Sequence, residues 1–456
     1  MKTIISGGVL LDPKAGLIHD QDIIISQGTI EKIVPHASVS ADNTEYEVID
    51  ASGLIVSPGF IDMHMHEDPI DPETGKIRTC IFDTMLRMGV TTVVAGNCGD
   101  NMYDPGDYLD IVDRDGTSVN VAMLAGHIFY RRRATDKDRY SAIDEKEKAV
   151  MLAGLQKALA RGCVGISFGI RYEPGMTCQE LLEVSRLCQK DHRLITAHVR
   201  NDAEYIFDSV EEFVAAGREL GLPMEVSHIG SMGAFGQMKQ LLKQLDDYRA
   251  AGIDVTADCY PYDAFSTEIG TTTYDEGWLE RYQCEYDACE FSEGKYKGQR
   301  CTKETFEEIR RDFPMCETVC YVMKQDEVDM ALLDPHVCVG SDGVLSDGQG
   351  HPRAAGAFPR FYSRYVRSGL LTPQEGIRKM SADAAARLNL TKKGSLDVGA
   401  DADLVLFDPD RLEDRATFAE PILPPVGIHR VIIGGETAVL NGEIVNGNLG
   451  KAVRFQ

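Results

Sequence analysis

The sequence predicts an α/β fold: a parallel (β/α)8 barrel of the TIM type with a small β-sandwich domain built from both chain ends. Eight short apolar runs alternate with segments whose apolar residues recur at intervals of three and four, the period of a helix. Both chain ends instead contain closely spaced short strands with Gly-rich and Asn-Gly turns. The length of 456 residues exceeds one ordinary domain but suits a barrel with an accessory domain.

The two ends of the chain are expected to share one domain. Short alternating runs predict strands near the start at residues 3–6, 9–11, 22–26, 29–34 and 46–50. Similar runs near the end predict strands at residues 403–407, 431–433, 437–440 and 443–445. We therefore expect residues 1–57 and 391–456 to form the β-sandwich.

Residues 58–390 are expected to form the barrel. Its strands are predicted at residues 54–61, 91–96, 120–126, 165–168, 194–198, 224–228, 254–257 and 336–340, with helices such as 145–161 and 179–190 between them. A strand followed by a helix, repeated eight times, is typical of this barrel. The interval between the seventh and eighth strands is too long for a simple connection, so residues of about 267–330 are expected to form an insertion beside the active-site mouth.

Composition excludes several classes of function. A formal net charge of -25 disfavours binding to nucleic acid or to an anionic membrane surface, and no uncharged run reaches the roughly 18 apolar residues of a membrane span. The 12 cysteines are scattered rather than arranged as a disulfide framework, which favours a reducing, cytoplasmic location. The expected partner is a small-molecule substrate, and assembly into a homo-oligomer is left open.

The first candidate ligands lie in the segment that begins the barrel. His64 and His66 follow an apolar run and a Pro-Gly step, with Asp62 beside them. Residues i and i+2 of a strand point to the same side, so the two imidazoles are expected to converge. Converging histidines at a strand end suit a borderline metal such as zinc.

Further ligand types stand at later strand ends. Cys98 follows the second expected strand, His198 ends the fifth, His228 ends the sixth and Asp342 follows the eighth. Catalytic residues of such barrels gather at the carboxyl ends of the strands. Each histidine or cysteine alone is as well explained by core packing, but six such residues at the same end of the barrel predict a site for one or two Zn²⁺ ions.

These residues resemble the amidohydrolase superfamily: the Pro-Gly-Phe-Ile-Asp-x-His-x-His opening, two single histidines and the Ser-Asp-Gly aspartate are its pattern. Most two-metal members bridge the ions with a carboxylated lysine on strand four, which is absent from residues 165–169. At Cys98 the chain instead resembles the D-aminoacylase group, in which a cysteine thiolate takes the place of that lysine. The resemblance implies zinc-dependent hydrolysis of N-acyl-D-amino acids to a D-amino acid and a carboxylate.

The resemblance also implies roles for single residues. Asp342 is expected to act as the general base and then the general acid, and a role purely as ligand is the alternative. Arg353 offers a planar fork that matches a carboxylate, unless it forms a loop salt bridge. The remaining expected substrate contacts are Tyr260, for which core packing is the alternative, Ser266, and Arg171.

Two departures from the family pattern affect the substrate. Gly230 stands where the family usually has a lysine that helps to hold the substrate carboxylate, and Ser346 stands where it tends to have a histidine. Alternatives to the deacylase are a D-residue dipeptidase, a cyclic-amide hydrolase, an aminohydrolase or a non-catalytic assembly protein. The preferred acyl and side-chain groups, the number of metals and the oligomeric state are left open.

Overall fold

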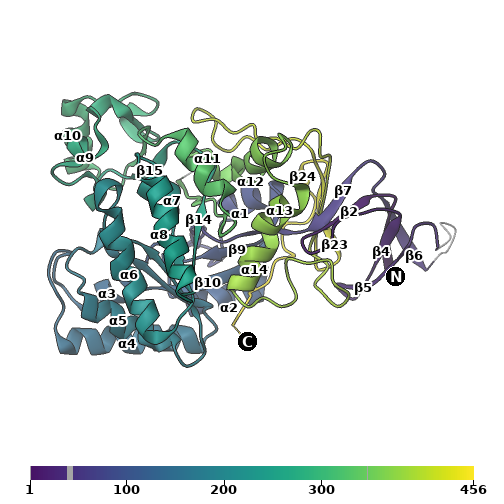
Figure 1. Ribbon diagram of the computed structural model, residues 1–456, viewed down its shortest axis with the longest axis horizontal. Coiled ribbons are helices and arrows are strands. Elements are labelled where there is room, and N and C mark those ends of the chain that lie inside the picture. The colour runs from purple at the N-terminus through teal and green to yellow at the C-terminus, as the bar shows by residue number, and fades with distance from the viewer. Residues whose placement is uncertain (1, 39–44, 347, 456) are drawn as a thin grey trace.

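The computed structural model describes residues 2–38, 45–346 and 348–455, and it contains an eight-stranded parallel barrel, two sheets at the chain ends and a small antiparallel sheet. Figure 1 shows the sheets of the chain ends at one end of the long axis, with helices α9 (Trp278–Tyr282) and α10 (Lys303–Asp312) at the other. In this view the barrel extends from the centre to the same end as α9 and α10 and lies below them.

Eight parallel strands form the barrel in the order β18-β14-β13-β12-β11-β10-β9-β8. Every residue of β9, β10, β11 and β12 is buried, as expected for strands covered on both faces. The predicted fold class is confirmed. The strands are β8 (Phe60–Asp62), β9 (Val90–Ala95), β10 (Asn120–Gly126), β11 (Gly165–Gly169), β12 (Leu194–His198), β13 (Met224–Val226), β14 (Val255–Cys259) and β18 (Val337–Val339).

The barrel closes between β18 and β8 just beyond the ends of these strands. Met65 bridges to Gly343, the Asp342 amide donates to the His64 carbonyl at 2.7 Å, and the His66 amide donates to the Gly343 carbonyl at 3.0 Å. The seam of the barrel is therefore made by the segments that carry three of the predicted metal ligands.

Helices follow most strands and cover the barrel (Figure 1). The predicted helix at 145–161 is found as α4, which begins with a capping box between Asp144 and Glu147. The predicted helix at 179–190 is shorter, because α5 ends at Ser185 and a 3₁₀ turn follows. The helices around the barrel are α1 (Cys80–Arg87), α2 (Pro105–Asp115), α3 (His127–Ala134), α4 (Glu145–Ala160), α5 (Cys178–Ser185), α6 (Ile206–Leu220), α7 (Ile229–Gly233), α8 (Met238–Ala250), α11 (Gln325–Leu333), α12 (Arg353–Phe361), α13 (Pro373–Ile377) and α14 (Asp383–Arg387).

The single strand predicted at 54–61 is wrong, because the chain changes sheet at Gly59. Strand β7 (Ile55–Pro58) pairs with the chain-end strands β2 and β21, whereas β8 pairs with β9 of the barrel. A Cβ atom at residue 59 would lie 2.0 Å from the Thr91 hydroxyl oxygen, so only glycine fits this close approach.

Two sheets contain the strands of the chain ends. One has the order β5-β4-β1-β6 and the other β24-β23-β22-β21-β7-β2-β3. Strand β3 was not predicted. These strands are β1 (Lys2–Ser6), β2 (Val9–Asp12), β3 (Gly16–Ile18), β4 (Gln21–Ser26), β5 (Thr29–Pro35), β6 (Tyr46–Asp50), β21 (Leu404–Phe407), β22 (Ile428–Ile433), β23 (Glu436–Leu440) and β24 (Glu443–Ile444).

The predicted domain bounds stay a prediction, and two contacts bear on them. Residues Gly450 and Ala452 bridge to Thr117 and Val121 of the barrel, so the last part of the segment assigned to the sandwich returns to the barrel. Helix α11 packs on α7 and α8, although its first residues fall within the predicted insertion at 267–330.

The insertion contains the small antiparallel sheet, in the order β15-β17-β16. Its strands are β15 (Phe265–Glu268), β16 (Cys289–Phe291) and β17 (Glu317–Cys320). An aromatic cluster supports them, with Trp278 between Tyr274 and Phe306 at ring distances of 5.1 and 5.2 Å. This core holds β15 and β17 at the edge of the barrel opening, where strand β15 follows directly from β14.

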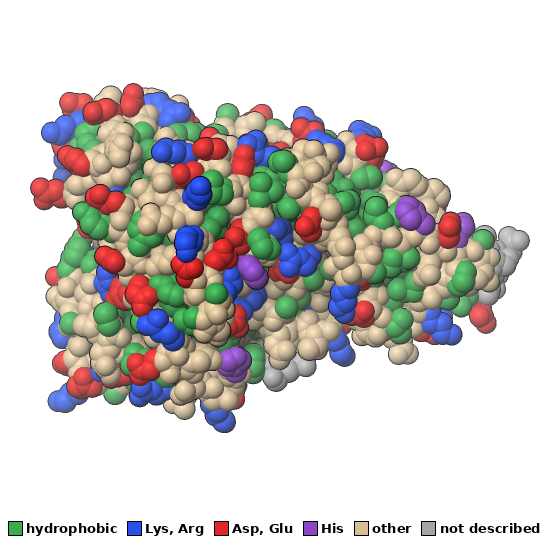
Figure 2. Space-filling model, viewed as in Figure 1, with side chains coloured by type: hydrophobic (Ala, Val, Ile, Leu, Met, Phe, Trp, Pro, Cys, Tyr) green, Lys and Arg blue, Asp and Glu red, His purple; other side chains and the backbone are tan. Residues whose placement is uncertain are grey.

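The surface and the helices bear on two expected exclusions. On the face in Figure 2, acidic and basic side chains are interspersed over the helices rather than gathered into a basic patch. Among the described residues, no helix is both long enough and apolar enough to span a membrane.

Candidate metal centre and active site

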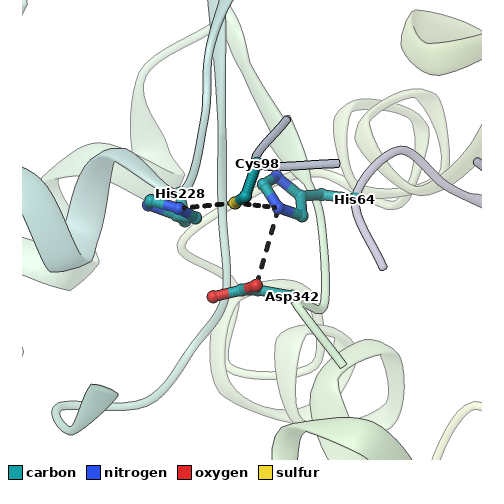
Figure 3. Close-up of side chains that lie close together, drawn as sticks. All are labelled: His64, Cys98, His228 and Asp342. Atoms are coloured by element: carbon teal, nitrogen blue, oxygen red, sulfur yellow. Dashed lines mark hydrogen bonds and ion pairs between the residues drawn. The ribbon is translucent and has the colours of Figure 1, made fainter. Parts of the chain in front are cut away.

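Four of the six predicted ligands converge at the carboxyl end of the barrel. One donor atom from each of His64, Cys98, His228 and Asp342 lies within 4.8 Å of the other three (Figure 3). The Cys98 Sγ lies 3.4 Å from the Nε2 atoms of both His64 and His228. The Asp342 Oδ1 lies 3.5 Å from the Nε2 of His64. The four side chains reach this point from β8, β9, β13 and β18.

Three of these four residues have a left-handed backbone. The φ angles are 53° at Cys98, 34° at His228 and 49° at Asp342. Such conformations are uncommon for residues with a side chain and cost of order 1–3 kcal/mol each, so they persist where the surroundings enforce them. Each turns the chain sharply just beyond a strand and aims its side chain inward.

The loop that carries Cys98 occupies space next to strand four of the barrel, β11. The Ser167 hydroxyl donates to the Gly96 carbonyl and accepts from the Gly99 amide. A Cβ atom at Gly169 would lie 2.0 Å from the Cys98 carbonyl oxygen. The end of strand four therefore leaves room for the cysteine loop, where most two-metal members of the superfamily that the sequence resembles have a lysine.

The electrostatics of the cluster suit a bound cation. Burial lowers the pKa of His64 to about 3 and that of His228 to about 4, so both imidazoles are neutral and can donate a lone pair. Burial raises the pKa of the Cys98 thiol well above its usual range, so a thiolate there needs a cation in contact. Two neutral imidazoles, a thiol and a carboxylate fit Zn²⁺.

Asp342 is the anion of the cluster. Burial alone would raise the pKa of Asp342, but the Arg353 guanidinium and the neighbouring histidines outweigh it and hold the pKa well below its usual range. The carboxylate is therefore ionised at neutral pH, as a ligand or a proton acceptor must be.

The other two predicted ligands lie beside the four. The His66 Nε2 lies 3.3 Å from the Asp342 Oδ1. The His198 ring lies 4.5 Å from the His228 ring, and its Nδ1 has no hydrogen-bond partner among the described residues. An unsatisfied nitrogen in a buried imidazole is costly in the absence of a ligand. Both rings thus border the cluster, His66 beside Asp342 and His198 beside His228.

A cavity of about 370 Å³ opens above the cluster, and Cys98, His66, His198, His228 and Asp342 form part of its wall. Arg353 and Ser266, two of the four predicted substrate contacts, also line this cavity. Tyr260 and Arg171 are not among the lining residues.

Arg353 is buried beside Asp342. Its Nη1 lies 2.8 Å from the Asp342 Oδ2, as an ion pair without hydrogen-bond geometry. The Nε and Nη1 atoms have no hydrogen-bond partner among the described residues, and Nη2 donates to the Ser266 carbonyl at 3.4 Å. The guanidinium is thus paired with Asp342 through Nη1, and its Nε lacks a hydrogen-bond partner among the described residues.

Tyr260 and Arg171 lie behind that wall. The Tyr260 ring lies 4.6 Å from the Arg353 guanidinium carbon, so the aromatic face supports the arginine. The Arg171 guanidinium donates to Asn201 Oδ1 and to the Thr273 carbonyl, each at 3.4 Å. Direct contact of either residue with substrate stays a prediction, and in this structure both side chains have protein neighbours instead.

The position of the missing lysine is closed. A Cβ atom at Gly230 would lie 2.9 Å from the Cys259 Sγ and 3.3 Å from the Met323 side chain. A lysine cannot be accommodated there without moving these neighbours. The change from the family pattern is therefore matched by the packing around it.

Sequence reasoning missed three acidic residues near the site. Asp258 on β14 contacts the His64 ring and the backbone amide of His228. Glu268 and Glu317 line the cavity. The signal for Asp258 was an acidic residue inside an apolar strand, but the strand was predicted to end at residue 257, whereas β14 continues to Cys259. Nothing local marked the two glutamates, which meet only through the pairing of β15 with β17.

Comparison with known families identifies the class of this protein. The amidohydrolase family model matches residues 55–438, which is most of the chain. The chain therefore belongs to the amidohydrolase family, as the strand-end ligands predicted.

Within that family, the chain is similar to two proteins of Alcaligenes xylosoxydans xylosoxydans. It is 31% identical to a D-aminoacylase, covering 95% of this chain and 93% of the relative. It is 32% identical to an N-acyl-D-glutamate deacylase, covering 95% and 92%. A solved N-acyl-D-glutamate deacylase of Bordetella bronchiseptica, complexed with zinc and a phosphonate inhibitor, matches with a TM-score of 0.87 and 30% identity, covering 99% of both chains.

Proposed function

We propose that this chain is a zinc-dependent hydrolase of linear amide bonds, which cleaves N-acyl-D-amino acids to a D-amino acid and a carboxylate. The observation that carries the proposal is the cluster of His64, Cys98, His228 and Asp342 at the floor of the cavity. Its cysteine stands beside a strand four without a lysine, and the similar deacylases supply the substrate class.

The four clustered residues would hold one Zn²⁺ ion, and His66 and His198 beside them would complete a site for one or two ions. When bound, zinc supplies Lewis acidity that activates water and polarises a carbonyl group. We assign the proton transfers to Asp342, whose carboxylate is ionised and faces the cavity. It takes a proton from the attacking water and delivers it to the departing amide nitrogen.

Arg353 is proposed to bind the α-carboxylate of the substrate. Arg353 lines the cavity, and its Nε has no hydrogen-bond partner among the described residues, whereas its Nη1 is ion-paired with Asp342 at 2.8 Å. A guanidinium has five N–H donors, so it can serve Asp342 and a substrate carboxylate together. Because Gly230 has no side chain that could bind the carboxylate, Arg353 is the main residue proposed to bind it. Ser266 lines the same wall, and its carbonyl orients Arg353 through the 3.4 Å hydrogen bond.

The test is a metal assay combined with a substrate panel. The purified protein should contain zinc and release free amine from N-acetyl-D-amino acids but not from the matching L-isomers. Adding a D-residue dipeptide, a cyclic amide and an amino-heterocycle to the panel tests the alternative activities. Turnover of one of these, with none of the N-acetyl-D-amino acids cleaved, would overturn the proposal. A cytoplasmic location and a homo-oligomeric state stay predictions.

A further inference from the structure

A buried carboxylate lies between two of the clustered histidines. Asp258, near the end of β14, places its Oδ2 at 3.0 Å from the Nδ1 of His64. Its Oδ1 accepts a hydrogen bond of 2.9 Å from the backbone amide of His228. The two histidines come from different strands, β8 and β13, so one side chain ties together two parts of the cluster.

We propose that Asp258 is a positioning residue that sets the ring orientation and tautomer of His64 and the backbone of His228, and thereby the zinc affinity of the centre. This inference rests on the metal centre proposed above. It assigns to Asp258 a contact with the ligands rather than with zinc or substrate.

The effect on His64 follows from the hydrogen bond. The Asp258 Oδ2, at 3.0 Å, accepts from the Nδ1–H of His64, which places the ring proton on Nδ1 and the lone pair on Nε2. It is Nε2 that lies 3.4 Å from the Cys98 Sγ and 3.5 Å from the Asp342 Oδ1. A carboxylate behind a ligating histidine raises the basicity of the ligand and holds its ring in place.

The effect on His228 concerns the backbone. With φ at 34°, His228 is in a conformation that a residue with a side chain seldom adopts, and its amide is directed to the Asp258 Oδ1. Gly340 leaves the space for this arrangement, since a Cβ atom there would lie 2.8 Å from that oxygen and 2.9 Å from the His64 Cβ. Residues that follow β8, β13 and β18 thus pack around the Asp258 carboxylate.

Asp62 provides a matched control. It is also a buried carboxylate beside the cluster, and its Oδ1 accepts from the backbone amides of His64 at 3.1 Å and Ser341 at 2.9 Å. Its Oδ2 has no hydrogen-bond partner among the described residues. At residue 62, an asparagine can replace the aspartate, because its single oxygen can accept from both backbone amides. At residue 258, the two hydrogen bonds end at different oxygens, and an asparagine has only one.

The experiment measures zinc dissociation constants by competition with a chelator for the full-length protein and for Asp258→Asn and Asp62→Asn. We expect Asp258→Asn to weaken zinc binding by about 10- to 100-fold, the usual effect of losing such a partner, and Asp62→Asn to leave it close to that of the unaltered protein. The visible spectrum of the cobalt-loaded protein should shift for Asp258→Asn only, and the melting temperatures of the metal-free proteins report any general loss of fold.

Unchanged zinc affinity and cobalt spectrum in Asp258→Asn would overturn the inference while leaving the metal centre intact. Equal losses in both variants would overturn it as well, because they would indicate a general effect of removing a buried charge. If the unaltered protein binds no zinc, the metal centre and this inference both fail. If Asp258→Asn does not fold, Asp258→Glu replaces it: the longer side chain displaces the carboxylate, so a loss of affinity supports the role and full affinity contradicts it.

Discussion

The floor and the mouth of the same cavity are built in different ways. At the floor, the donors of the metal cluster stand just beyond barrel strands and are buried, and the Asp342 amide donates to the His64 carbonyl across the barrel seam. At the mouth, the insertion contributes Glu268 on β15 and Glu317 on β17, which are partly exposed and directly opposite each other in the sheet register. Like charges in that position destabilise a pair of strands.

The charges of the two regions are balanced differently. At the floor, Asp258 faces His64, and Asp342 faces His64 and Arg353. At the mouth, burial raises the pKa of both Glu268 and Glu317 to about 7, and the Glu268 carboxylate adds to the upward shift of Glu317. The barrel ends thus carry the proposed chemistry on a rigid scaffold, and the insertion carries residues suited to selecting substrates. The predictions below separate the two regions.

The largest effect is expected at the floor, from Asp342→Asn. An amide cannot accept the proton from water, so kcat should fall by at least about 10²- to 10⁴-fold. Steady-state kinetics on an N-acetyl-D-amino acid, with circular dichroism as the control for folding, measures it. A folded variant with a kcat near that of the unaltered protein would remove Asp342 from its proposed role.

Cys98→Ala should lose zinc and activity together, because the thiolate is the anionic sulfur ligand of the cluster. Cys163→Ala is the matched control, since Cys163 is equally buried but belongs to the apolar core. Zinc content after gel filtration decides the outcome. A full complement of zinc in Cys98→Ala would show that the thiol is not a ligand and only packs in the core.

Arg353→Ala stands between the two regions and should act mainly on binding. Losing a charge-assisted pair with the substrate carboxylate costs about 1.5–3 kcal/mol, or roughly a 10- to 150-fold rise in KM. Arg360→Ala, in the same helix, is the control, because Arg360 contacts Tyr262 and Asp414 instead. If KM is unchanged while the protein remains folded, the substrate carboxylate is bound elsewhere.

A smaller effect on selectivity is expected at the mouth. Glu268 and Glu317 line the cavity and repel a carboxylate on the side chain of the substrate. N-acetyl-D-glutamate should therefore have a lower kcat/KM than N-acetyl-D-leucine. Glu268→Gln combined with Glu317→Gln should narrow the difference, and Glu280→Gln, on exposed α9, should not. The same ratio in all three proteins would mean that the mouth plays no part in selection.

The smallest effect concerns stability and pH. The folded pKa of about 7 for each glutamate exceeds the ordinary value of 4.5, so their contribution to stability is fully present below about pH 4.5 and is lost as the pH rises through 7. Asp100 and Glu293 add to the upward shift, whereas Arg132, Arg139 and Arg353 oppose it.

The double Gln variant lacks this titration. Its melting temperature relative to the unaltered protein should therefore be higher at pH 8 than at pH 5. Thermal unfolding at the two values, with Glu280→Gln as the control, tests the difference. An offset that does not depend on pH would assign the change to packing rather than to charge.

The sequence by itself determined the barrel and the residues that come together at its floor. Because the carboxyl ends of parallel strands meet at one end of a barrel, residues such as Cys98 and Asp342 could be predicted as neighbours although 244 positions separate them in the chain, from 98 to 342. Burial on both faces leaves nearly continuous apolar runs in most of the barrel strands, and the helices between them keep apolar residues at intervals of three and four.

Only the tertiary structure decided the contacts that depend on register and packing. It placed Tyr260 behind Arg353 instead of in the cavity, and it divided the first predicted barrel strand at Gly59. It also brought Glu268 opposite Glu317 and placed Asp258 between His64 and His228. A local pattern specifies which face of a strand is buried, but the residue that lies opposite is chosen by the pairing of distant strands and by the space that their neighbours leave.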